Sequence, residues 1–245
     1  MTKTVYGRVV FGASAVMFGV VSLMWRGSDM WTYLHPIPGG LGTIVAWILA
    51  IAQIAGGAAL LLPRTARFGA IVLGFTFVLF ALAAIFGIIG APTAYFQYGN
   101  FFEKLSVVCG ALAVYAVTEP NLARSSALGR VARLGLGLCA VSFALSQIFY
   151  LQFTASLVPK WIPPNQVFWA NATTAAFLLA ALAILINRRA RLALRLMAAM
   201  LALFGVLVWF PQLIAHPAAL GNWSEFADTF LIAGATWVVA EVAPV

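Results

Sequence analysis

Charged residues are scarce in this chain of 245 residues. Asp, Glu, Lys and Arg make up 8% of it, and only six residues are acidic, whereas an average soluble domain is about 25% charged. Hydrophobic residues make up 64%, and the mean hydropathy is +1.02. A soluble fold of this size leaves much of its surface in water and cannot bury so many apolar side chains. The composition therefore predicts an integral membrane protein with no separate soluble domain.

Cysteine and histidine are also scarce, with two of each. Cys109 and Cys139 fall at expected depths about 8 Å apart, and a disulfide requires Cα atoms within about 7 Å of each other. We therefore expect free, buried thiols that pack as small hydrophobic residues. His35 and His216 precede prolines in turns, and no Cys, His or Asp cluster has metal-ligand spacing. The sequence predicts no metal or haem site and no intrinsic cofactor.

The sequence also lacks the common catalytic signatures. It has no phosphate-binding loop, no dinucleotide fingerprint after a strand, no Gly-x-Ser-x-Gly elbow and no His-Glu-x-x-His. Whether the chain is an enzyme therefore stays open at this point.

Long apolar stretches recur along the chain with short interruptions. A membrane-spanning helix needs roughly 20 apolar residues, and eight such helices with short loops use nearly the whole chain. We predict an all-α membrane protein with spans at about 5–25, 41–62, 67–90, 101–118, 134–157, 165–186, 192–214 and 223–243.

Basic residues outnumber acidic ones by 14 to 6, which gives a net charge of +8. They lie at predicted helix ends, without the basic stripe and interleaved aromatics of a nucleic-acid-binding surface, so we predict no nucleic-acid partner. Eleven of them precede the first span or follow spans two, four and six, and three lie on the opposite side. By the positive-inside rule both termini face the cytoplasm. We therefore predict a multi-pass protein of the plasma (inner) membrane.

The second half of the chain resembles the first at polar and proline positions. Residues 64–67 match 188–191, 34–38 match 159–163, and 99–103 match 221–225, at offsets of 124, 125 and 122. A unit with an even number of helices repeats in the same direction through the membrane, so the repeat is parallel. We predict two four-helix bundles, at 1–118 and 134–245, joined by a cytoplasmic basic linker at 119–133.

Three local patterns resemble the DoxX-like family of membrane proteins. They are the Pro-rich turn before an apolar helix, Leu-Leu-Pro-Arg-Thr-Ala-Arg at 61–67, and Asn-Trp-Ser-Glu-Phe at 222–226. The resemblance covers each four-helix half, although relatives typically carry one such unit. It implies a membrane subunit linked to quinone-dependent respiratory redox chemistry, with a bound quinone and a partner protein.

Polar residues without an obvious structural purpose gather on the predicted outer side. The candidates for a ligand or proton site are Asp228, Glu225, Glu103, Lys104, His35, Lys160 and His216. Asn100 and Asn222 each stand three residues before a glutamate, a spacing that equally predicts helix capping.

Asp228 lies deeper in its span, and at the offset of 122 its counterpart is Ser106. Intramembrane acids normally face the bundle interior or a polar cavity. Asp228 is therefore the sharpest difference between the two halves, either as a functional acid or in an ion pair with Lys104, Lys160 or Arg26.

Aromatic and amide side chains have simpler expected roles. Tryptophans near the outer boundary, among them Trp31, Trp161 and Trp223, are predicted to form an aromatic belt, with the lining of a ligand site as the alternative. Gln53 and Gln147, within predicted spans, are expected to form hydrogen bonds between helices.

Three functions fit these observations. The first is a DoxX-like subunit that binds a quinone or lipid-like molecule on its outer side, while a partner protein supplies the redox centre. The second is a transporter of small molecules, ions or lipids, in which Asp228 and Glu225 take up a proton or cation. The third is a purely structural assembly subunit. The expected partners are the lipid bilayer and a redox protein, and assembly into a homo-oligomer stays open.

Overall fold

The computed structural model describes residues 5–34 and 37–243, and every regular element among them is helical. Seven helices are long and apolar enough to cross a membrane, so the chain is an all-α, multi-pass membrane protein. These seven are α1 (Val5–Met24), α3 (Leu41–Leu61), α4 (Ala66–Gly90), α5 (Tyr95–Val117), α6 (Leu122–Phe149), α8 (Gln166–Leu185) and α9 (Ala190–Phe204), the last one continued by η2 and α10.

The remaining elements are one long helix and five short ones. The short elements are α2 (Asp29–Leu34), η1 (Pro38–Gly40), α7 (Leu151–Leu157), η2 (Gly205–Trp209) and α10 (Phe210–Ala215). The long helix, α11 (Leu220–Val242), coincides with the eighth predicted span. It carries Glu225, Asp228 and Glu241 and is not among the seven apolar helices.

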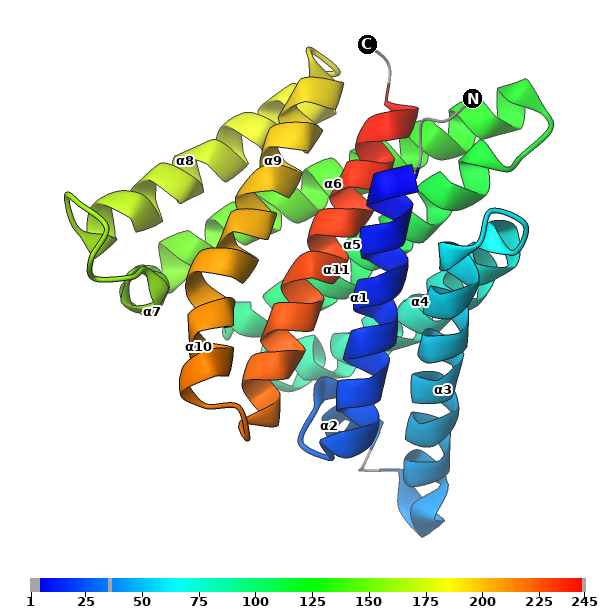
Figure 1. The fold of residues 1–245 in the computed structure, drawn as a ribbon, viewed down its shortest axis with the longest axis horizontal. Helices are drawn as coiled ribbons and strands as arrows, with labels where there is room; N and C mark the ends of the chain where they lie inside the picture. Colours follow the sequence, from blue (N-terminus) through cyan, green and yellow to red (C-terminus); the bar gives the residue numbers. More distant parts are fainter. Residues whose placement is uncertain (1–4, 35–36, 244–245) are drawn as a thin grey trace.

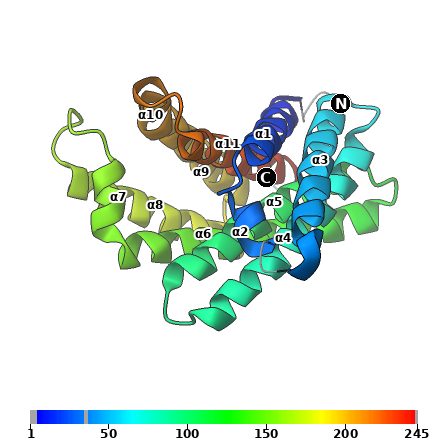
Figure 2. The ribbon, with the colours of Figure 1, turned by 90° about the horizontal axis from the view of Figure 1, so that it is seen from below.

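The helices form one bundle with α1, α5 and α11 at its centre. In Figure 1, α1 and α11 lie side by side, with α3 and α4 on one flank and α8 and α9 on the other. α5 packs against α4, α6 and α11, and α6 continues the bundle to α8. Figures 1 and 2 both show that α8 and α10 diverge toward the end of the bundle that carries α7.

Small residues bring the three central helices into close contact. A Cβ atom on Gly234 of α11 would lie 2.6 Å from the backbone nitrogen of Phe11 in α1, and one on Gly110 of α5 would lie 2.5 Å from Cβ of Ala235 in α11. Such approaches between backbones are the usual means by which membrane helices associate, because lipid provides no hydrophobic force between them. Gly7 of α1 likewise meets Trp237 near the end of α11, so α1 and α11 run antiparallel.

Two helix boundaries differ from the sequence prediction. α5 begins at Tyr95 and not near 101, and α6 covers Leu122–Phe149 in place of 134–157. Most of the predicted linker at 119–133 is thus the first part of α6. The physical reason is that 122–133 contains mainly Leu, Ala and Arg, which are good helix formers, and Asn121 caps the helix by accepting a hydrogen bond from the Arg124 backbone N–H at 3.0 Å.

The longer α6 also changes the position of one cysteine. Cys109 and Cys139 are free and buried, as predicted. Cys109 approaches α6 one turn before Cys139, because a Cβ atom on Gly135 would lie 2.6 Å from the Cys109 Sγ. Since α6 begins twelve residues earlier than expected, Cys139 lies in the middle of the helix and not near its end.

A π-helical segment interrupts the seventh span. α9 ends at Phe204, and five residues of π-helix, Gly205–Trp209, join it to α10. Pro211 stands in the first turn of α10 and has no N–H to donate to the preceding turn. Single-turn π segments of this kind change the direction of a helix and often lie at functional sites.

Candidate functional site

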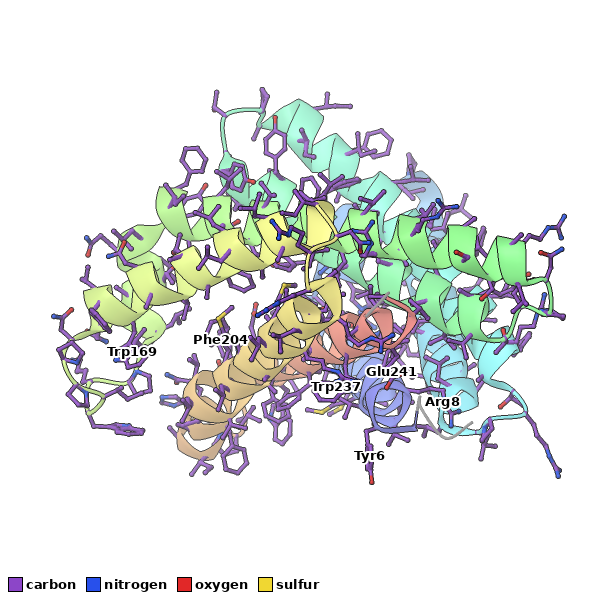
Figure 3. All side chains as sticks on the ribbon, turned by 90° about the horizontal axis from the view of Figure 1, so that it is seen from above. Tyr6, Arg8, Trp169, Phe204, Trp237 and Glu241 are labelled. Atoms are coloured by element: carbon purple, nitrogen blue, oxygen red, sulfur yellow. The ribbon has the colours of Figure 1, made fainter. Side chains whose placement is uncertain are left out.

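The divergence of α8 from α10 leaves a largely apolar cavity, here called the lateral cavity, of about 360 Å³. Its walls come from α5, α6, α7, α8, the loop before α8, the last residue of α9, and η2. In Figure 3, Trp169 of α8 and Phe204 of α9 lie on opposite sides of the opening. A concave apolar site with a few polar groups is the usual form of a small-molecule site.

The loop before α8 is held in place by local hydrogen bonds. Trp169 donates its indole N–H to the carbonyl of Pro163 at 2.8 Å, and Gln166 donates its amide to the carbonyl of Val158. Asn165 caps α8 by accepting from the Phe168 backbone N–H at 2.8 Å. These bonds fix one wall of the lateral cavity.

Gln147 of α6 provides the best-defined polar group in the cavity wall. The hydroxyls of Thr174 and Thr173, both on α8, lie 2.8 Å and 3.1 Å from its carbonyl oxygen, and each shares its one proton between that oxygen and a backbone carbonyl of α8. Because these bonds occupy the oxygen, the two amide N–H groups are what Gln147 can offer to a ligand. The predicted role of Gln147 in joining helices is confirmed, as is that of Gln53, which donates to the carbonyl of Ala15 at 3.1 Å.

The inner end of the cavity meets a buried ionic cluster. Asn100 and Glu103 of α5 line the cavity. Lys104 places its Nζ 3.6 Å from Oε2 of Glu103 and 3.9 Å from Oδ2 of Asp228 in α11. The Lys104 side chain is only 4% exposed, and that of Asp228 is 14% exposed. The ammonium also lies 5.7 Å from the ring centre of Phe18 in α1, so one lysine joins the three central helices.

The structure thus brings three of the predicted site residues together, Glu103, Lys104 and Asp228. Lys160 and His216 are exposed and lie in loops, and Glu225 is exposed on α11, one turn before Asp228. His35 lies outside the described residues. Among the described residues, no group of three or more His, Cys, Asp or Glu side chains could hold a metal ion.

The capping role predicted for Asn100 and Asn222 is wrong. α5 begins at Tyr95 and α11 at Leu220, so each asparagine lies inside its helix and not at the cap position. Helices in these two places start earlier because Pro92 and Pro217, a few residues upstream, end the preceding turn, after which nothing interrupts the helix.

The three tryptophans predicted near the outer boundary have different environments. Trp161 is 74% exposed, in the manner of an interfacial residue. Trp223 is half-buried and donates its indole N–H to the carbonyl of Pro217 at 2.9 Å. Trp31 is buried, donates to the carbonyl of Ser22 at 2.7 Å and packs edge-on against Trp47. Trp31 is therefore a core residue. It belongs neither to an aromatic belt at the membrane boundary nor to the lining of a ligand site.

Sequence reasoning missed most of the cavity wall. Trp169 and Thr173 were not among the predicted site residues, because apolar and hydroxyl side chains are ordinary in membrane helices. The available signal was the pair Gly205 and Pro211, whose spacing permits a break in an otherwise apolar span.

Arginines bind the carbonyl ends of four helices at the opposite end of the bundle. Arg8 donates to the carbonyl of Leu60 and Arg133 to that of Ile184. Arg67 donates to the carbonyl of Thr118 at 3.0 Å, and Arg191 to that of Ala243 at 2.6 Å. These bonds satisfy carbonyls that a helix end leaves without partners.

No protein-family model, curated protein or solved structure matches this chain.

Proposed function

We propose that the lateral cavity binds a lipid-like molecule of the quinone class, and that the chain is a DoxX-like membrane subunit in quinone-linked redox chemistry. The observation that supports this most is an apolar cavity that ends at Asn100, Glu103 and Gln147. Such a cavity suits an amphipathic ligand with a long apolar part and a small polar head. A partner protein would supply the redox centre.

The polar residues match the head of a quinone. Its carbonyl oxygens accept hydrogen bonds, and the Gln147 amide is oriented to donate them because its own oxygen is held by Thr173 and Thr174. The Glu103 carboxylate can accept a hydrogen bond from the hydroxyl of the reduced, quinol form. Lys104 and Asp228 hold Glu103 at the inner end of the cavity.

The buried cluster favours one alternative, transport of an ion or small molecule. A lysine between two carboxylates inside a helical bundle is the kind of group that proton-coupled transporters use. In that case a substrate would move between the helices while the cluster exchanges a proton. The two functions differ in whether Asp228 is needed for binding alone or for movement of substrate across a vesicle membrane.

We also propose that α11 is an eighth span and that the chain is a parallel repeat. The support is a set of paired hydrogen bonds at a constant offset. Arg8–Leu60 corresponds to Arg133–Ile184, Arg67–Thr118 to Arg191–Ala243, and Tyr98–Pro92 to Trp223–Pro217, all at offsets of 124 or 125 residues.

This offset revises the interpretation of Asp228. At an offset of 125 its counterpart is Glu103, and Ser106 no longer corresponds to it. Gly110 and Ala235, which approach each other between α5 and α11, are also counterparts, as expected for residues beside a pseudo-twofold axis. Glu103 and Asp228 then occupy the same position in the two repeats, and the difference between the halves lies elsewhere.

That difference is the lateral cavity itself. Ser22, the counterpart of Gln147, accepts the Trp31 indole N–H through its carbonyl. α2 packs on both α3 and α4, whereas its counterpart α7 packs on α8 and α6 and, among the described residues, makes no comparable contact with α9. We propose that only the second half binds a ligand. The basic helix ends then face the cytoplasm, with the cavity on the outer side of the plasma membrane.

Quinone binding can be tested on the purified protein in detergent. A short-chain ubiquinone is titrated while tryptophan fluorescence is recorded, since Trp169 and Trp209 line the cavity and a bound quinone quenches them. We expect saturable quenching, weakened about tenfold or more in Gln147→Leu, because the loss of a well-formed hydrogen bond in an apolar site costs about 1–2 kcal/mol.

The matched control is Ser22→Ala, which alters the counterpart position in the first half and should leave the quinone affinity unchanged. Extraction of copurifying lipids, followed by mass spectrometry of the wild type and of Asp228→Asn, identifies the natural ligand. The proposed function would be rejected if the quinone quenches Gln147→Leu and Ser22→Ala equally and if the lipid extract contains no quinone. Uptake of a solute by vesicles that depends on Asp228 would support transport.

A further inference from the structure

A second hollow lies on the outside of the bundle, between the last turns of α8 and the first turns of α9. This α8–α9 groove has a volume of about 370 Å³ and is lined by Ala176, Ala180 and Ala183 of α8, by Ala193 and Met197 of α9, and by neighbouring leucines. Leu179 and Leu196 beside it are 68% and 62% exposed. Because α8 and α9 are both apolar enough to span the membrane, the groove faces lipid.

Two arginines close one end of the groove. Arg188 and Arg189 occupy the turn between α8 and α9 and line the hollow with exposed side chains. The turn is fixed, because the Arg188 N–H donates to the carbonyl of Ala183, the Arg189 carbonyl accepts from the Ala193 N–H, and Arg189 has φ +53. In the described part of the chain, no hydrogen bond or ion pair occupies either guanidinium.

The acidic residues at this end of the bundle are engaged elsewhere. Glu119 forms an ion pair with Arg67 at 3.2 Å, and Glu241 lies among Trp237, Arg195 and Arg8. The two arginines of the turn therefore add a local charge of +2 at the mouth of an apolar groove. Basic pockets between membrane helices attract the phosphate of anionic lipids.

The first half of the chain shows why the groove exists. The corresponding pair, α3 and α4, is packed so closely that a Cβ on Gly69 would lie 2.6 Å from the carbonyl oxygen of Gly56. At the offset of 124, these glycines correspond to Ala193 and Ala180, which both line the groove. The methyl groups of Ala180 and Ala193 keep α8 and α9 apart, because the closest approach between membrane helices requires glycine at the contact.

We propose that the α8–α9 groove binds an anionic phospholipid, with its phosphate on Arg188 and Arg189 and an acyl chain along the alanines. The site is separate from the lateral cavity, which uses the first turns of α8 and not the last ones. It therefore does not depend on quinone binding, and either proposal can fail without the other.

The test is native mass spectrometry of the purified protein in a neutral detergent, titrated with dioleoyl phosphatidylglycerol or dioleoyl phosphatidylcholine. We expect the wild type to bind the anionic lipid more tightly. The double variant Arg188→Gln/Arg189→Gln should lose about 30-fold of that affinity, since each basic residue near an anionic headgroup contributes roughly fivefold. Arg188→Lys/Arg189→Lys keeps the charge and should retain most of it.

Arg64→Gln is the matched control. Arg64 is the exposed counterpart of Arg188 at the α3–α4 turn, where glycine packing leaves no corresponding room, and its loss should not change the affinity. Ala183→Leu and Ala176→Leu, which fill the groove at two different depths, should each weaken the binding of phosphatidylglycerol at least fivefold while the protein elutes as the wild type does on gel filtration.

Three results would overturn the proposal. They are an equal affinity of the wild type for both lipids, a loss in Arg64→Gln as large as in the double arginine variant, and unchanged binding in whichever filled-groove variants fold.

Discussion

At the scale of single residues, Lys104 is a buried positive charge at the centre of the bundle. Its ammonium is buried, and two carboxylates and an aromatic ring from α5, α11 and α1 surround it. Charges in a low-dielectric interior are stable only when partners compensate for the lost hydration. Replacement of the lysine leaves two carboxylates near each other without a positive partner. If one carboxylate is removed as well, less uncompensated negative charge remains in the interior.

We therefore expect Lys104→Met to lower the stability by about 3 kcal/mol, the usual loss when one partner of a buried pair is removed. The double variant Lys104→Met/Asp228→Asn should recover at least half of that loss. The thermal midpoint of each purified variant, followed by intrinsic fluorescence in one detergent, measures the effect. A Lys104→Met protein that melts with the wild type would show that the cluster does not hold the helices together.

At the scale of elements, the glycine contact between α3 and α4 makes the first half the tighter one. Gly69→Ala would place a methyl group 2.6 Å from the Gly56 carbonyl oxygen and 2.8 Å from the Leu60 nitrogen. Both obstacles are backbone atoms, which cannot rotate away, so the helices must separate. Overpacking of this kind costs about 1–3 kcal/mol.

Gly69→Ala should thus lower the thermal midpoint by several degrees, while Gly74→Ala on the same helix should have little effect. A Cβ on Gly74 meets only Cβ of Ala111 at 3.3 Å, and alanine favours the helix over glycine by about 1 kcal/mol. Equal midpoints for the two variants would mean that α3 and α4 are free to move apart.

Elements and site differ in how far the sequence predicts them. Apolar runs indicate the spans well, because a helix in lipid must satisfy all its backbone groups internally. The start of α6 at Leu122 was not predicted, since a segment rich in arginine was interpreted as a linker although it contains strong helix formers. The basic side chains there still face water and helix ends while the backbone is helical.

The site was predicted only where it is charged. Glu103, Lys104 and Asp228 stand out because charges are rare in such a chain, and the structure places them together. The lateral cavity depends on the course of the π-helical segment η2 after α9 and on the loop that Trp169 holds in place. Those are consequences of packing between distant segments, for which a single sequence contains no direct signal.

At the scale of the whole molecule, α11 decides the number of crossings. The helix carries three acids, yet its central residues Leu231, Ala235 and Val238 are fully buried, and α1, α5 and α9 surround it. Acidic side chains within a membrane are tolerated when they face such an interior. α11 is also antiparallel to α1 in Figure 1, so that the start of α1 and the end of α11 lie at the same end of the bundle.

We expect reporter fusions to place both ends of the chain on the cytoplasmic side. Green fluorescent protein fused after Thr65 or Val245 should fluoresce, because these positions follow the second crossing and the proposed eighth crossing. Alkaline phosphatase fused after Thr93 or Pro217 should be active, since these turns stand on the other side. Pro217 lies just before α11, so the fusions after Pro217 and Val245 differ only by that helix. If both report the same side, α11 lies within the bundle without crossing, and the seven apolar helices alone span the membrane.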